Sequence, residues 1–88
     1  RAHAAMASLD LAVILMHRNA SDEACLLADE AFGVFRGLKI NDAQVEALLV
    51  LREVLEQRIV TAGFLQSLVD FLRRAEHDPY ARYEPRFG

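Results

Sequence analysis

The residue types that most often carry chemistry are present in this chain, but the sequence does not group them. His3, His17 and His77 are far apart, and no two of them have the i, i+4 spacing of a helical metal-binding pair. Cys25 is the only cysteine, so it forms no ligand cluster and no internal disulfide. We therefore expect no metal site and no cofactor.

Paired carboxylates are the next candidates for chemistry. Asp29 with Glu30, and Glu53 with Glu56, lack the histidine three residues on that accompanies glutamates in di-iron helices. The glycines are isolated and form no phosphate-binding loop, and no serine stands in the sequence signature of an activated nucleophile. These carboxylates are better explained as solvated helix faces, and we predict that the chain is not an enzyme.

Composition narrows the classes of function further. The chain has 88 residues and a net charge of −3, and its scattered arginines form no basic stripe, so we expect no nucleic-acid partner. The longest apolar run, residues 11–16 (LAVILM), is far shorter than the ~20 residues of a membrane span, and we expect no membrane partner. A cytoplasmic location is the default. Because the sequence begins with Arg1, we expect it to be a piece of a longer chain.

Residues 21–37 (SDEACLLADEAFGVFRG) form the clearest predicted helix. We expect Ser21 to cap its first turn and Gly37 to close it in the left-handed conformation. Its predicted buried face is a stripe at helical spacing, about half of it alanine: Ala24, Leu27, Ala28, Ala31, Val34, Phe35 and Leu38. Small side chains on this face predict a closely packed neighbouring helix.

Three more helices are predicted around it, at about residues 4–18, 42–60 and 62–77. Asn41 with Gln44 forms a capping box for the third helix, and Thr61 is the predicted cap of the fourth. The third is expected to bury Val45, Leu48, Leu49, Leu51, Leu55 and Ile59, and the fourth Phe64, Leu65, Leu68, Val69, Phe71, Leu72 and Ala75. The fold class is thus all-α, with two antiparallel helical hairpins in one domain, residues 1–79, and an extended tail, residues 80–88.

The helix at 4–18 is apolar on both sides. Leu9, Ala12, Val13 and Met16 fall on one face, and Leu11, Ile14 and Leu15 on the other. Either the helix lies deep within this bundle, or its second face packs against a preceding helix or another subunit. The sequence leaves both alternatives open.

Spacing across the first hairpin is similar to that of the tetratricopeptide repeat: Leu11-Ala12-x-x-Leu15, then Ala24, Ala28 and Ala31. The chain departs from the motif at its usual Trp, Tyr, aromatic and Pro positions, which are occupied here by Ser8, Leu15, Ala28 and Arg36. The longer second hairpin resembles the capping end of a repeat array. The resemblance implies right-handed stacking of the hairpins and the carboxy-terminal repeat of a bacterial regulatory protein.

Three hypotheses for function follow. The first is a protein-interaction scaffold that presents a groove to a peptide or helix, and its predicted contact residues are Leu11, Ile14, Leu26, Tyr80, Tyr83 and Phe87. The alternative is a self-associating four-helix bundle, a homodimer that buries the spare face of the first helix. A helix-turn-helix DNA-binding protein is disfavoured, because Asp70 and Glu76 cancel Arg73 and Arg74 in its recognition helix.

Overall fold

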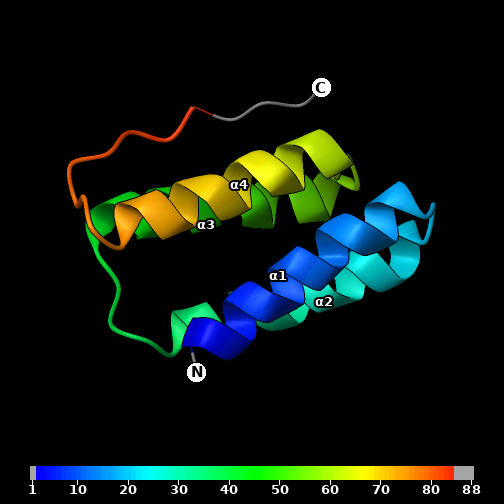
Figure 1. The fold of residues 1–88 in the computed structure, drawn as a ribbon, viewed down its shortest axis with the longest axis horizontal. Coiled ribbons are helices and arrows are strands. Elements are labelled where there is room, and N and C mark those ends of the chain that lie inside the picture. The colour runs from blue at the N-terminus through cyan, green and yellow to red at the C-terminus, as the bar shows by residue number, and fades with distance from the viewer. Residues whose placement is uncertain (1, 85–88) are drawn as a thin grey trace.

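A computed structural model describes residues 2–84, in which four α-helices follow one another without strands (Figure 1). They are α1 (Ala2–His17), α2 (Ser21–Arg36), α3 (Asp42–Gln57) and α4 (Ala62–Ala75). This confirms the predicted all-α class with four helices. The predicted helices agree with the observed ones to within about three residues at each end.

The helices form a ring in which each contacts two others. α1 packs against α2 and α4, and α3 packs against the same two helices. Successive helices run in opposite directions, and in Figure 1 α1 and α4 lie in front of α2 and α3. The pair α1 and α2 shares the largest contact, whereas α2 and α3 meet least. The first hairpin is therefore tightly packed, whereas the contact between the two hairpins at α2 and α3 is looser.

Alanines explain the close contact of the first hairpin. Ala24, Ala28 and Ala31 of α2 are all buried, as are Ala5 and Ala12 of α1. Methyl side chains allow two helix backbones to approach more closely than leucine or phenylalanine would permit. The predicted stripe is thus confirmed at its centre. At its edge it was wrong: Val34 is exposed, because it lies on the flank of the helix rather than under a neighbour.

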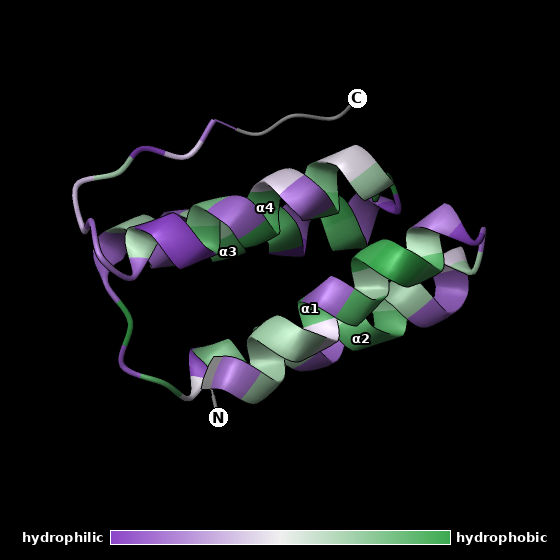
Figure 2. Cartoon of the chain, viewed as in Figure 1, coloured by the Kyte–Doolittle hydropathy of each residue, from purple (hydrophilic) through white to green (hydrophobic). Residues whose placement is uncertain are grey.

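The predicted core of α4 is confirmed at every position, since all seven of its apolar residues named above are buried. In α1, Leu9, Ala12 and Val13 are buried, while Leu11 and Ile14 are exposed. The C-terminal half of α1 is hydrophobic in Figure 2, although only one side of it contacts the core. Of the two alternatives for α1, the structure thus shows a second face that residues 2–84 leave uncovered.

The buried face of α3 differs from the prediction. It consists mainly of smaller or less apolar residues than expected: Ala43, Gln44, Ala47, Leu48, Leu51 and Val54. Val45, Leu49 and Ile59 were predicted to be buried and are exposed, and Leu55 is half-buried. Residues 47–51 (ALLVL) are all apolar, so apolar side chains occur on every side of this part of the helix. The spacing of apolar residues therefore did not determine which side faces the core.

The predicted roles of Ser21 and Gly37 at the ends of α2 were wrong. Ser21 is the first helical residue rather than a cap, and Ala20 before it makes no side-chain capping bond. Gly37 has φ −86°, so α2 ends in right-handed geometry instead of the predicted left-handed closure. The left-handed residues are Asn19 after α1 and Arg58 after α3. Arg58 ends α3 at Gln57, and that is why Ile59 lies outside the helix.

Asn41 joins the two ends of the second hairpin. Its side chain accepts a bond from the Gln44 amide at 3.0 Å, and the Gln44 side chain accepts one from the Asn41 amide at 3.2 Å. This is the predicted capping box. The side-chain nitrogen of Asn41 also donates to the Ala75 carbonyl at the end of α4, at 2.7 Å. One side chain therefore caps α3 and holds the end of α4 beside it.

Replacing Asn41 by Ala is expected to lower the free energy of unfolding by about 1–3 kcal/mol, since a cap and a part-buried hydrogen bond are both lost. Thr61→Ala is the matched control, because the Thr61 hydroxyl accepts a capping bond from the Phe64 amide at 3.0 Å. We expect it to cost about 1 kcal/mol. Urea unfolding of the two variants measures both values, and equal losses would contradict the linking role of Asn41.

Candidate functional site

Four of the predicted contact residues are exposed: Leu11, Ile14, Leu26 and Tyr80. Leu11 and Ile14 lie one turn apart on α1, and Leu26 projects from α2 opposite the alanine stripe with 68% of its surface exposed. Tyr80 follows α4. They come from three segments, and none of them lines the groove described below. Their role in binding stays a prediction.

Tyr83 does not lie free for a partner. Its ring packs against Phe71 of α4 with centroids 5.0 Å apart, and only 7% of the residue is exposed. Burial raises the pKa of its phenol, and the nearby Ser67 side chain acts in the opposite direction. The tail thus lies back on the bundle at this position, and a contact between Tyr83 and a partner stays a prediction. Phe87, the last predicted contact residue, lies outside the described residues.

A groove lies where the end of α2, the connection after it and the first half of α3 meet. It encloses about 550 Å³. Its apolar lining is formed by Phe32, Phe35, Leu38, Ile40, Val45, Leu48 and Leu49, and its polar lining by Arg36, Lys39 and Arg52. A volume of this size lies within the range of binding pockets, about 300–1,000 Å³.

Local structure explains why these apolar side chains stay uncovered. Val45 and Leu49 are four residues apart, so they stand above one another on the same side of α3. The capping box at Asn41 fixes where α3 begins, and burial of Ala47 and Leu51 on the opposite side of the helix turns both side chains outward. Phe35 and Leu48 lie beneath as the buried floor. The orientation of α3 that makes its predicted buried face wrong therefore also creates the groove.

Cations border this groove. The Arg36 guanidinium lies over the Phe32 ring, 5.9 Å from its centroid. Arg52 Nε donates to the Glu56 carboxylate at 3.2 Å, in a pair that is more than half exposed on both sides. Lys39 extends from the connection between α2 and α3. No acidic residue is among the residues that line the groove.

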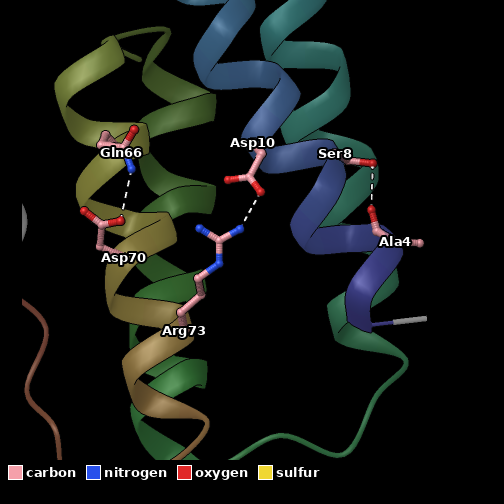
Figure 3. A network of polar contacts seen from close by, with 6 residues as sticks. All are labelled: Ala4, Ser8, Asp10, Gln66, Asp70 and Arg73. Atoms are coloured by element: carbon pink, nitrogen blue, oxygen red, sulfur yellow. Dashed lines mark hydrogen bonds and ion pairs between the residues drawn. The ribbon is translucent and has the colours of Figure 1, made fainter.

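The remaining reactive groups have structural explanations. Burial raises the pKa of the Cys25 thiol, the nearby Asp22 carboxylate adds to that effect, and Arg58 opposes it. A raised pKa keeps the thiol protonated at neutral pH, which suits a small packed side chain rather than a nucleophile. Arg73 of α4 bonds Asp10 of α1 across the two hairpins, as Figure 3 shows. Over residues 2–84, no three His, Cys, Asp or Glu side chains are grouped as a metal ion would require.

The sequence predicted a groove for a peptide or helix but not the residues that line this one. Its members come from three consecutive segments, and five of them, Phe32, Leu38, Ile40, Val45 and Leu49, are apolar and reach the surface or its edge. The available signal was Val45 with Leu49 at i, i+4 beside the buried pair Leu48 and Leu51. That pattern indicates a second apolar side of α3, but the sequence did not show which side faced outward.

Over residues 2–84, no helix combines the length and the apolar character that crossing a membrane requires. Comparison of the chain with protein-family models, with curated proteins and with solved structures found no match.

Proposed function

We propose that this chain is a non-catalytic protein-interaction module that holds a helix or peptide of a partner in the groove between α2 and α3. The observation that carries the proposal is the set of apolar side chains that this groove leaves uncovered, above all Leu49, which is 57% exposed. Concave apolar surfaces bordered by a few polar groups are the usual form of a peptide-binding site.

Energetics support this use of the groove. Burying an exposed leucine side chain contributes roughly 1.5–3 kcal/mol, so several such side chains together supply useful affinity. The floor under them is the packed core at Phe35 and Leu48, which keeps the groove in shape before a partner arrives. A preformed site loses less conformational entropy on binding than a flexible one.

The resemblance of the first hairpin to the tetratricopeptide repeat supports the same class of function. On this proposal the chain is the closing part of a bacterial helical-repeat scaffold that acts in regulation in the cytoplasm. Its partner is a protein or peptide, and neither a cofactor nor a nucleic acid takes part.

The test selects ligands from a display library of random peptides of about 16 residues, a length that forms about four helical turns. Labelled protein is then titrated with a selected peptide and followed by NMR. We expect the amide shifts to concentrate at Phe32, Leu38, Ile40, Val45 and Leu49. We also expect Leu49→Asp to reduce affinity by at least about tenfold, because a charge is placed where the ligand buries apolar surface.

Leu26→Asp is the matched control, since it makes the same change at an exposed helical leucine outside the groove. It should fold as the parent does and bind the selected peptide equally well. A loss of binding in Leu26→Asp but not in Leu49→Asp would move the site to the outer face of α2. Shifts centred on Leu11 and Ile14 would move it to α1.

Self-association through α1 is the second candidate, and the exposed pair Leu11 and Ile14 favours it. Light scattering over a range of protein concentrations would detect a dimer. A mass that rises with concentration in the parent but not in a Leu11→Asp variant would support this role, and a monomer throughout would exclude it.

A further inference from the structure

The charge around the groove is opposite in sign to that of the whole chain. The chain carries 13 acidic and 10 basic residues, yet Arg36, Lys39 and Arg52 border the groove and no carboxylate lines it. Lys39 is the only lysine of the chain. A local concentration of cations beside exposed apolar side chains selects for a ligand that combines apolar and acidic groups.

Existing contacts leave these cations able to bind. Lys39 extends from an irregular connection and is exposed. Arg36 is stacked on Phe32, an arrangement that leaves the edge of a guanidinium free for carboxylates. Arg52 is paired with Glu56 on the same helix, but an exposed pair of this kind contributes less than about 1 kcal/mol and exchanges easily. Carboxylates lie in two neighbouring hollows. Asp29 and Glu56 line one that shares Phe32 and Arg52 with the groove, and Glu76 lines one that shares Lys39 and Ile40 with it.

We infer that the ligand of this groove is an amphipathic helix of a partner protein, with an apolar stripe that enters between Phe32, Leu38 and Leu49 and Asp or Glu residues on both flanks. The inference rests on the proposed function and adds the chemistry of the partner. The cations come from both helices, Arg36 from α2 and Arg52 from α3, so acidic flanks of a bound helix would meet a cation supplied by each. The cations of the groove also attract an acidic helix to this part of a chain whose net charge is −3.

Three synthetic peptides of about 16 residues test this, with one shared apolar stripe at i, i+3, i+4 and i+7 and either Glu, Gln or Lys on the flanks. Binding is measured by fluorescence anisotropy at low and high salt. We expect the Glu peptide to bind about tenfold more tightly than the Gln peptide at low salt, and the Lys peptide to bind most weakly. The preference should shrink as salt screens the exposed charges.

The double variant Arg36→Glu with Lys39→Glu should abolish or invert this order. Its matched control is Arg18→Glu with Arg82→Glu, which changes the net charge equally at two exposed arginines that do not line the groove. The control should keep the preference for the Glu peptide. Circular dichroism and thermal unfolding of both double variants establish that they are folded before binding is compared.

The other outcomes separate the inference from the proposed function. Equal binding of the Glu and Gln peptides, with NMR shifts in the groove, would overturn the acidic partner and leave the interaction module standing. Failure of all three peptides and of the library would overturn both. Binding to vesicles of phosphatidylcholine and phosphatidylserine that is lost in the groove double variant would assign the cations to an anionic lipid surface instead. A mass that rises with concentration and falls in that variant would make a second copy of this chain the occupant.

Discussion

Phe35→Ala is expected to lower the free energy of unfolding by about 3–5 kcal/mol, the range found when a buried phenylalanine is truncated. Phe35 is 2% exposed and is among the largest fully buried side chains of the described residues. It stands under the connection between the hairpins and forms part of the groove floor. The other buried residues of α2 are alanines, and their methyl side chains are too short to fill the space. The cavity should therefore persist.

Urea unfolding followed by circular dichroism measures this effect, since a domain of this size is expected to unfold in one cooperative transition. Val34→Ala is the control from the adjacent position, where the side chain is 38% exposed, and it should cost less than about 1 kcal/mol. Similar losses in the two variants would mean that α2 is rotated from the orientation described.

Leu9→Ala is the second large effect, expected at about 2–5 kcal/mol. Leu9 is completely buried on the face of α1 that packs within the ring, whereas Leu11, two residues later, is 46% exposed. Leu11→Ala removes the same atoms from the other side of the same helix and should cost less than about 1 kcal/mol. The pair measures how much of an all-apolar helix contributes to the stability of this chain alone.

Thermal and urea unfolding of both variants should be run at several protein concentrations. If Leu11→Ala destabilises as much as Leu9→Ala at high concentration only, the second face of α1 is buried between two copies. If it does so at every concentration, Leu11 belongs to the core and the described exposure of that face is incorrect. A small cost throughout agrees with a face that stays in solvent.

The sequence predicted α4 most accurately, because its apolar residues recur at helical period and polar residues such as Gln66, Asp70 and Arg73 occupy the other side. The capping residues Asn41 and Thr61 were also predicted, since capping depends on side chains within three residues of the helix start. The alanine stripe of α2 was predicted at its centre. These are local features, and the sequence alone carries them.

The position and lining of the groove depend on tertiary structure and were not predicted. In α3, apolar residues surround much of the helix, so choosing the buried side required knowing that α2 and α4 approach at Ala43 and Ala47 rather than at Val45 and Leu49. Gly37 was predicted to be left-handed and is not, whereas Arg58, for which no such geometry was predicted, is left-handed. The sequence left open whether the tail lies back on the bundle or binds a partner, because a short segment without a period does not indicate that Tyr83 returns to Phe71.

Because the four helices form a ring, the same arrangement could be built from a chain that connects them in a different order. The beginning of α1 and the end of α4 lie at one end of the bundle, where His3 and His77 border the same small hollow. A short glycine-rich linker could therefore join these two helices, and the chain could begin instead at α3, within the connection before Asn41. In such a circular permutant the ring would close at the linker and open within the connection that lines the groove. A permutant that folds but no longer binds would show that the bundle closes without an intact connection, whereas its binding surface requires one.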